Sequence, residues 1–272
     1  MNSLAGSDIL PCMSFPVHRK KTARIKIGDV SVGGAAPVAV QSMTNTRTDD
    51  VDATVAQIKR LEAAGCEIIR VAVPDAASAS AIRAIKTAIS IPLIADIHFN
   101  YRLAIASVEA GADGLRINPG NIGSSRKIKA VADCVRGAGV PIRVGVNAGS
   151  LEKDILKKHK GATAEAMVES ALRNVDILRS FDVDSIKVSI KASDVPRTVE
   201  AYRLFSATSD LPVHLGVTEA GGLFPGVVKS SLGIGMLLAE GIGDTIRVSL
   251  TRDPVEEIRV GYEILKALGL RH

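Results

Sequence analysis

The sequence has few aromatic residues and few cysteines, and each shortage narrows the class of protein. It has no Trp, and aromatic residues make up 3% of its 272 residues, so Val, Ile, Leu and Ala must fill the core. The three cysteines, Cys12, Cys66 and Cys134, are far apart and odd in number. This pattern excludes a disulfide framework and shows no metal-ligand spacing. We therefore expect a reduced, cytoplasmic protein.

Long apolar runs and long basic runs are also missing. No apolar run approaches the roughly 20 residues that a membrane span needs, and the first residues lack a convincing secretory signal. The net charge is +5, and the basic cluster from His18 to Lys21 is more typical of a solvated face than of a nucleic-acid patch. We therefore expect neither a membrane nor a nucleic acid as a partner.

The chain contains eight strand patterns, each followed by a helix pattern. Residues 1–21 are expected to form an N-terminal tail, and alternation from Arg24 to Val32 around Gly28-Asp29 predicts a short hairpin. The strands are expected at Val38 to Met43, Ile68 to Val73, Leu93 to Ile97, Leu115 to Asn118, Ile142 to Asn147, Ile186 to Lys191, Val213 to Thr218 and Ile246 to Leu250. The first helix is expected to be capped by Thr48 or Asp49 and to run to Ala64. The others are expected near 76–89, 101–110, 125–137, 163–181, 195–207, 226–239 and 254–268, with a Lys-rich insertion at 152–160.

This organisation predicts an α/β fold, a (β/α)₈ TIM barrel over residues 22–272 with a short N-terminal β-hairpin. A doubly wound parallel sheet is the alternative. The turn after the first strand has no Gly-x-Gly-x-x-Gly pattern, which favours the barrel.

Alternation along the strands predicts which side chains point into the barrel. The helix-facing side must be apolar, as Val40, Val71 and Val144 are, so the intervening residues face the axis. Those inward residues are Gln41, Arg70, Asp96, His98, Arg116, Asn118, Arg143, Asn147, Lys187, Ser189, Lys191, His214, Thr218, Arg247 and Ser249. Six of them are Lys or Arg, whereas Asp96 is the one inward carboxylate, with Glu219 beyond its strand at the mouth.

Six converging cations with two acids favour an anionic ligand. Burying an unpaired charge costs several kcal/mol, so internal pairing is not expected to account for the set. A single inward Arg is often a structural ion-pair residue, and His214 alone is more often a hydrogen-bonded core residue. Taken together, the residues predict a phosphate or diphosphate site, because the guanidinium presents a rigid fork of donors.

Five motifs in this order and spacing resemble one family. They are Gln41-Ser42-Met43-Thr44-Asn45-Thr46, Arg70-Val71-Ala72-Val73-Pro74, Ala95-Asp96-Ile97-His98-Phe99, Arg116-Ile117-Asn118-Pro119-Gly120-Asn121-Ile122-Gly123 and Val217-Thr218-Glu219-Ala220-Gly221. In the fourth, Pro119 and Gly120 are expected to end a strand and leave a loop. The family is 4-hydroxy-3-methylbut-2-enyl diphosphate synthase, of the methylerythritol phosphate route to isoprenoids, and the resemblance runs from about Thr22 to Leu270.

The resemblance implies an oxidoreductase that binds 2-C-methyl-D-erythritol 2,4-cyclodiphosphate at the mouth of a TIM barrel. Such an enzyme opens the ring and removes a hydroxyl with two electrons from a [4Fe-4S] cluster. It also implies flavodoxin or ferredoxin as the electron donor of the full enzyme, and a homodimer.

The same resemblance implies roles for individual residues. Arg116, Arg143 and Lys191 would bind the diphosphate, and Glu219 would handle protons as the catalytic residue. The other residues expected to bind substrate are Ser249 and Thr251 as hydroxyl donors, Asn118 and Asn147 as orienting residues, and Arg70, Asp96, His98, Lys187, His214 and Arg247.

One departure from the family affects the expected chemistry. Members carry a further C-terminal domain whose cysteines and glutamate hold the cluster, and this sequence stops at His272, where that domain would begin. None of the three cysteines matches a cluster ligand. We therefore expect the barrel domain alone, with no bound cluster or other metal and no activity by itself.

Three other functions stay open at this stage. A Schiff-base aldolase would use Lys187 or Lys191 as a nucleophilic amine with a depressed pKa. A pterin-binding barrel of the dihydropteroate synthase kind also presents Asn and Asp at strand ends, but it does not require so many cations. A ligand-binding module without chemistry is the third.

Overall fold

The barrel is built from eight parallel strands. The computed structural model describes residues 17–271, so most of the expected tail, including Cys12, lies outside the described residues. The strands are β3 (Ala39–Met43), β4 (Ile68–Ala72), β5 (Leu93–Asp96), β6 (Gly114–Ile117), β7 (Ile142–Asn147), β8 (Ile186–Lys191), β9 (His214–Leu215) and β10 (Thr245–Ile246). They pair in the order β8-β7-β6-β5-β4-β3-β10-β9, and a parallel bridge between Val188 and Val213 joins β8 to the strand beside β9. The predicted TIM barrel is confirmed.

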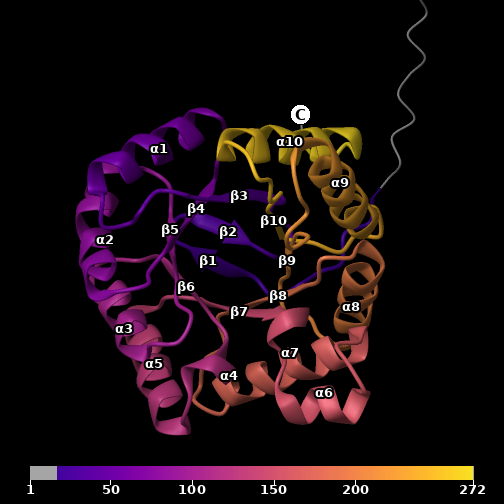
Figure 1. Ribbon diagram of the computed structural model, residues 1–272, viewed down its shortest axis with the longest axis horizontal. Helices are drawn as coiled ribbons and strands as arrows, with labels where there is room; N and C mark the ends of the chain where they lie inside the picture. The colour runs from indigo at the N-terminus through magenta and orange to yellow at the C-terminus, as the bar shows by residue number, and fades with distance from the viewer. Residues whose placement is uncertain (1–16, 272) are drawn as a thin grey trace, which may run out of the picture.

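A ring of helices surrounds the strands (Figure 1). One long helix follows each strand: α1 (Val51–Ala63), α2 (Ala76–Ala88), α3 (Tyr101–Glu109), α5 (Ser125–Ala138), α7 (Ala164–Arg179), α8 (Val195–Thr208), α9 (Leu223–Ala239) and α10 (Pro254–Ala267). Each lies where helical spacing of apolar residues predicts it, although α9 begins three residues earlier than the expected 226.

The first helix begins later than the sequence predicts. Its N-cap is Asp50, whose carboxylate accepts a hydrogen bond from the Ala53 backbone N–H at 3.1 Å. The two residues expected to cap it are otherwise engaged, because the Thr48 hydroxyl donates to the Ala72 carbonyl and Asp49 pairs with Arg47. The assignment of Thr48 or Asp49 as the cap was therefore wrong.

Three short elements interrupt the loops on the mouth side. The segment after β6, expected to be a loop, forms the short helix α4 (Pro119–Ile122), and the Asn118 side chain accepts from the Gly120 N–H at its start. The 3-10 turn η1 (Ala148–Ser150) follows β7, and α6 (Lys153–His159) occupies the Lys-rich insertion. Strands β9 and β10 are shorter than expected, so Arg247 and Ser249 lie beyond the end of β10.

The apolar face of each strand packs against the helices, as the alternation predicts. Val40, Val71, Val144 and Val188 are buried within one cluster that also contains apolar residues of the surrounding helices. Burial of β-branched side chains between strands and helices is the main apolar stabilisation of such a barrel. The residues that alternate with these apolar ones therefore face the barrel interior.

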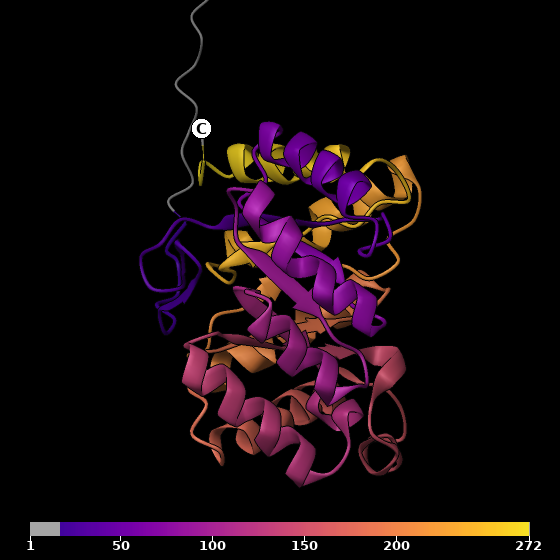
Figure 2. The ribbon, with the colours of Figure 1, turned by 90° about the vertical axis from the view of Figure 1, so that its left-hand side faces the viewer.

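The predicted hairpin is confirmed, and it covers the amino-terminal end of the barrel. Strands β1 (Ile25–Ile27) and β2 (Val30–Val32) pair antiparallel. Their buried residues Ile25, Ile27 and Val32 pack on the lowest inward layer, Ala39, Ile68 and Ile94. The hairpin lies across the centre of the ring in Figure 1 and protrudes from one side of the barrel in Figure 2.

The segment before the hairpin is attached to the barrel. Arg19 pairs with the buried carboxylate of Asp244 at 3.2 Å, and the Lys20 ammonium donates to the carbonyls of Ser206 and Ser209. The expectation of a solvated basic cluster was therefore wrong for Arg19 and Lys20, because backbone carbonyls and a buried acid supply partners that the sequence does not reveal. Among residues 17–271, none of the helices has the length and apolar character that a membrane crossing requires.

Candidate active site at the mouth of the barrel

A polar hollow of about 360 Å³ lies at the carboxyl ends of the barrel strands. This volume suits a small molecule, and active sites of TIM barrels lie at this end. The hollow is lined by Met43, Arg70, Asp96, His98, Arg116, Arg143, Asn147, Ser189, Lys191, Val217, Thr218, Glu219, Arg247 and Ser249. Ten of the fourteen residues expected at the site are among them, contributed by seven of the eight strands or by the loops that follow.

Asp96 is the centre of an ion-pair cluster on one side of the hollow. Its carboxylate lies 3.4 Å from Arg70 Nε, 3.1 Å from Arg116 Nη1 and 3.6 Å from His98 Nε2. Burial alone would raise the pKa of Asp96, but Arg70, His98 and Arg116 outweigh it and hold the pKa well below its ordinary value. Asp96 is therefore an anion that fixes two guanidinium groups at the rim.

Arg247, on another side of the hollow, is paired with an acid that the strand pattern does not reveal. Glu257 on α10 accepts hydrogen bonds from Arg247 Nε at 3.1 Å and Nη2 at 3.2 Å, and also from the Ser42 hydroxyl and the Leu250 N–H. Its side chain is buried. The sequence-based count of two acids for the six inward cations, Asp96 and Glu219, missed this third carboxylate, because Glu257 lies on a helix and not on a strand.

Arg143 and Lys191 are the cations lining the hollow that form no ion pair with an acid among residues 17–271. Arg143 is 2% exposed, and its Nε and Nη1 have no hydrogen-bond partner within the described chain. Burial, together with repulsion from Arg70 and Arg116, lowers the pKa of Arg143 well below its ordinary value. The pKa of Lys191 is lowered in the same way, first by burial and then by Arg143 and Arg70. Buried, crowded cations of this kind are stabilised by an anion that contacts them.

Glu219 lies at the rim in an unusual backbone conformation. It is exposed, and its φ of 51° lies in the left-handed region, which a non-glycine residue seldom adopts. Such conformations cluster at functional sites, where the surrounding structure holds them in place. The carboxylate lines the same hollow as Lys191 and Arg247.

Two of the expected residues lie inside the barrel but do not line the hollow. Lys187 is 1% exposed, and its ammonium lies 3.4 Å from Thr245 Oγ1. His214 Nδ1 lies 2.8 Å from the same hydroxyl, and the side chain is fully buried. Burial is the main cause that lowers the pKa of both groups well below their ordinary values. They form a polar layer nearer the barrel centre, joined by Thr245, which the sequence did not single out.

Asn118 and Thr251 also lie away from the hollow. The buried Asn118 side chain caps α4, and its Oδ1 accepts the Gly120 N–H, which Asn174 Oδ1 also accepts. Thr251 is exposed beyond the last strand, where its backbone N–H donates to the Gly221 carbonyl. The structure thus gives Asn118 a helix-capping contact. The expected contacts of Asn118 and Thr251 with substrate stay predictions.

The hollow also contains residues that the sequence did not assign to the site. Met43, Ser189, Val217 and Thr218 line it. Ser189 and Thr218 share the inward phase, and Met43 lies two residues beyond the inward Gln41, so alternation could have found these three, whereas Val217 has the opposite phase. The Met43 sulfur lies 3.0 Å from Arg70 Nη2 and 3.5 Å from Arg247 Nη1, between the two guanidinium groups.

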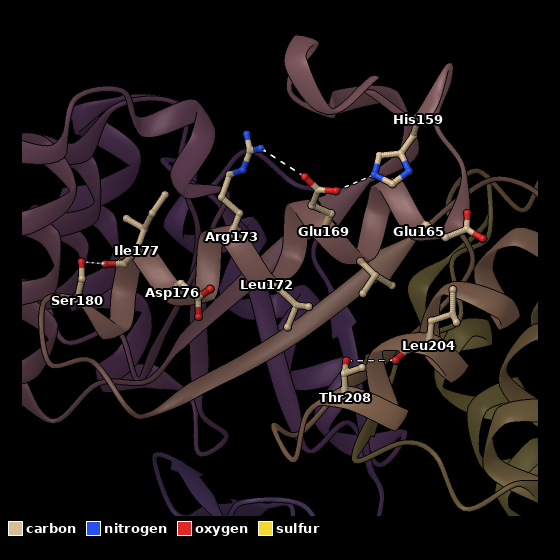
Figure 3. Close-up of a pocket in the computed structure, with 11 residues that line it drawn as sticks. His159, Glu165, Glu169, Leu172, Arg173, Asp176, Ile177, Ser180, Leu204 and Thr208 are labelled. Atoms are coloured by element: carbon tan, nitrogen blue, oxygen red, sulfur yellow. Dashed lines mark hydrogen bonds and ion pairs between the residues drawn. The ribbon is translucent and has the colours of Figure 1, made fainter. Parts of the chain in front are cut away.

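A second hollow, of about 800 Å³, lies outside the barrel between α7 and α8 (Figure 3). Leu172, Ile177 and Leu204 contribute apolar surface to it, and Glu169 at its edge contacts His159 and Arg173. Three of its charged residues, His159, Glu169 and Arg173, pair with one another. Because this groove lacks converging unpaired cations, the mouth is the better candidate for a site of chemistry.

Comparison with known proteins identifies the family. The model of the GcpE TIM-barrel domain matches residues 22–262. The chain is 58% identical over 256 residues to 4-hydroxy-3-methylbut-2-en-1-yl diphosphate synthase (flavodoxin) of Aliivibrio fischeri, covering 94% of this chain and 69% of that protein. The enzymes of the same name from Vibrio cholerae and Pseudomonas paraeruginosa are 59% and 60% identical, and the matches cover 68% and 69% of their lengths.

Solved structures of similar fold are dihydropteroate synthases. The enzyme of Stenotrophomonas maltophilia superposes with a TM-score of 0.63 over 89% of this chain and 98% of that one, at 12% identity. The Xanthomonas albilineans enzyme in complex with 7,8-dihydropteroate gives 0.61 over 89% and 98%, at 16% identity. At such low identity the likeness shows the barrel fold alone. The family match, together with the cationic mouth, establishes that this chain belongs to the GcpE TIM-barrel domain family, homologous to 4-hydroxy-3-methylbut-2-en-1-yl diphosphate synthase.

Proposed function

We propose that the mouth of the barrel binds 2-C-methyl-D-erythritol 2,4-cyclodiphosphate for reductive opening of its ring to 4-hydroxy-3-methylbut-2-enyl diphosphate. The observation that carries the proposal is the pair of buried cations, Arg143 and Lys191, which line a hollow of about 360 Å³. The two phosphates of the substrate supply the missing negative charge. The names of the relatives support the same diphosphate chemistry.

Arg116, Arg143 and Lys191 are proposed to hold the diphosphate. Arg143 lines the hollow, and two of its buried guanidinium nitrogens lack a partner within the described chain, whereas Arg116 offers its guanidinium from beside Asp96. A forked guanidinium binds two phosphate oxygens at once, whereas the Lys191 ammonium acts as a point charge. Arg70 and Arg247, already paired with acids, set the positive field at the rim.

The remaining polar residues would orient the carbon skeleton. Asn147 and Ser249 line the hollow and offer an amide and a hydroxyl to the substrate oxygens. Glu219 is the proposed proton donor for the departing hydroxyl, because it lines this rim without an ion pair to any arginine among residues 17–271, unlike Asp96. A hydroxyl leaves more readily when protonated.

Reduction needs two electrons, which in this family come from a [4Fe-4S] cluster. Among residues 17–271, no group of three or more His, Cys, Asp or Glu could hold a metal ion. Burial raises the pKa of Cys66 to about 12, so that thiol is a poor metal ligand, and Cys134 lies apart on α5. The described residues do not fit a cluster, and we assign no step through one.

Other features of the full enzyme follow from its relatives. Their names specify flavodoxin, so we propose flavodoxin over ferredoxin as the electron donor. A homodimer and a cytoplasmic location stay predictions. The family match favours none of the aldolase, pterin-binding or purely ligand-binding alternatives.

Titration calorimetry with the cyclodiphosphate tests the binding proposal. We expect the wild-type chain to bind, and Arg116→Ala to weaken binding by about 10- to 150-fold, because a charge-assisted contact to phosphate is worth roughly 1.5–3 kcal/mol. The matched control is Arg259→Ala, which removes an exposed arginine paired with Glu256 on α10.

The control is expected to bind as the wild type does, and circular dichroism should show both variants folded. A loss of less than about twofold in Arg116→Ala would mean that Arg116 is structural. Absence of binding by the wild-type chain would refute the proposed substrate site.

A further inference from the structure

Two glycines face the barrel interior beside the candidate site. Gly145 lies within β7, and Gly216 follows β9, each two residues from an inward-facing side chain. Neither has a positive φ, so the backbone does not require glycine at either position. A glycine inside a strand weakens it and often marks a place where another group approaches closely.

The space beside Gly145 is occupied by the side chain of Arg116. A Cβ added at Gly145 would lie 2.5 Å from Arg116 Nε, 2.9 Å from Nη2 and 3.1 Å from Cζ. These are the three nearest atoms, and all belong to one guanidinium. The Arg116 head group therefore fills the volume that any side chain at position 145 would take.

The register of the strands explains why Arg116 needs this space. Arg116 on β6 is the register partner of Arg143 on β7, and both point inward. Two guanidinium groups on adjacent strands repel each other and cannot share one level of the barrel. Arg143 is buried at its own level, whereas Arg116 leans over Gly145, the next inward position of β7, and reaches Asp96.

We infer that Gly145 is a positioning residue for anion binding, because its missing side chain keeps open the space in which the Arg116 guanidinium lies between Asp96 and the bound phosphate. The inference rests on the proposed diphosphate site. In Gly145→Ala the methyl group would displace the guanidinium. The strand would keep its conformation, because the obstructed atoms are the far end of a flexible side chain.

Gly216 shows a related contact that is less suited to a test. A Cβ there would lie 2.6 Å from Lys191 Nζ, but also 2.7 Å from the backbone carbonyl oxygen of Arg247. A substitution would therefore shift the backbone as well as the lysine. Gly149, in the turn after β7, is the matched control, since nothing lies within 4 Å of a Cβ added there.

A double-mutant cycle tests the inference by calorimetric titration of the cyclodiphosphate. We expect Gly145→Ala to weaken binding at least about fivefold, a smaller loss than in Arg116→Ala, since the charge is displaced but not removed. Gly149→Ala should bind as the wild type does. In the Arg116→Ala background, Gly145→Ala should cost nothing further, because no guanidinium is left to displace.

A second measurement needs no ligand. The Nε of Arg116 is buried without a hydrogen-bond partner within the described chain, so its N–H signal in an arginine side-chain ¹H–¹⁵N spectrum should be distinct. The Arg116→Ala spectrum assigns that signal by its absence. We expect the signal to move in Gly145→Ala and to stay in place in Gly149→Ala.

The outcomes separate this inference from the proposed function. An unmoved Arg116 signal with wild-type affinity in Gly145→Ala would overturn the inference while leaving the diphosphate site intact. Equal losses from Gly145→Ala with and without Arg116 would also overturn it, because the glycine would then act through the strand. If the wild type fails to bind, the proposed site is refuted, and the inference falls with it as a statement about anion binding.

Discussion

Lys191 shows how one buried side chain couples ligand binding to protons. In the free protein its pKa is depressed, chiefly by burial and then by Arg143. A diphosphate placed beside the ammonium favours the charged form and raises that pKa. The free protein therefore holds fewer protons than the complex at pH values between the pKa of Lys191 in the free protein and its raised pKa in the complex.

We accordingly predict that binding of the cyclodiphosphate takes up protons and weakens as the pH rises through the pKa of free Lys191. Calorimetry at several pH values, each in two buffers of different ionisation enthalpy, measures the uptake. Lys191→Met removes the titrating amine and should reduce the uptake as well as the affinity. Equal uptake in the variant and the wild type would show that another group takes the proton.

At the residue scale, the direction of a side chain could be predicted where it depends only on the residue's position along its own strand. Alternation placed Arg70, Arg116 and Arg143 at the mouth, because inward and outward positions alternate without exception along a regular strand. It could not distinguish depth, so it did not reveal that Lys187 and His214, both expected to bind substrate, are buried and do not line the hollow. Depth depends on strand stagger, which the residues of one strand do not encode.

At the scale of elements, helix α10 contributes directly to the mouth. Glu257 on this outer helix accepts four hydrogen bonds, two of them from Arg247. The carboxylate lies between the helix and the strand end, and it holds the last strand segment against α10. No strand periodicity reveals such a residue, because its position depends on how the helix docks.

We predict that Glu257→Ala destabilises the fold by about 3 kcal/mol or more, because it leaves a largely buried guanidinium without its partner. Urea unfolding measures the free energy. The neighbouring Glu256→Ala is the control: that exposed carboxylate pairs with Arg259 on the surface, and its loss should cost less than about 1 kcal/mol. Similar decreases in the free energy of unfolding in both variants would show that the buried pair contributes no more than the exposed one.

The ends of elements were predicted less well than their existence. The Asp50 cap was missed because several adjacent residues could cap α1, and tertiary contacts such as that of Thr48 with Ala72 decide among them. Helix α4 was missed because Pro119 and Gly120 after a strand favour a loop, whereas Asn118 caps a short helix there. The hairpin was predicted from its turn residues, but its contact with Ala39, Ile68 and Ile94 was not. Contacts between distant segments leave no local pattern.

At the scale of the whole molecule, the barrel encloses charge that should make it sensitive to acid. The pKa of His214 is lowered by burial and the pKa of Asp96 is lowered by its cationic neighbours. Both groups therefore bind more protons when unfolded than when folded. The stability from His214 is lost as the pH falls below its unfolded pKa of about 6.5, and that from Asp96 below about 3.9.

We predict that the free energy of unfolding decreases between about pH 7 and pH 5, with a slope approaching 1.4 kcal/mol per pH unit for a single proton. Urea unfolding at several pH values measures it. His214→Gln should be less stable at about pH 7 but should show a flatter dependence. An unchanged slope in the variant would exclude His214 as the source.

The fold as a whole was the most predictable feature. Eight repetitions of one strand-and-helix pattern agree with one another, so an error at a single boundary leaves the topology unchanged. The charge balance of the mouth was less predictable. Glu257, which lies on a helix and outside the strand pattern, adds a negative charge that the strands do not reveal.

The hairpin closes the amino-terminal end of a barrel whose interior is already packed by Lys187, His214 and Thr245. Ile27 and its neighbours stop that end with apolar side chains, so a charged molecule has no aqueous route past them. A ligand that enters at the carboxyl end of the barrel must therefore leave through the same mouth. A product that keeps both phosphates therefore occupies the proposed diphosphate site, and it competes with the next substrate for that site.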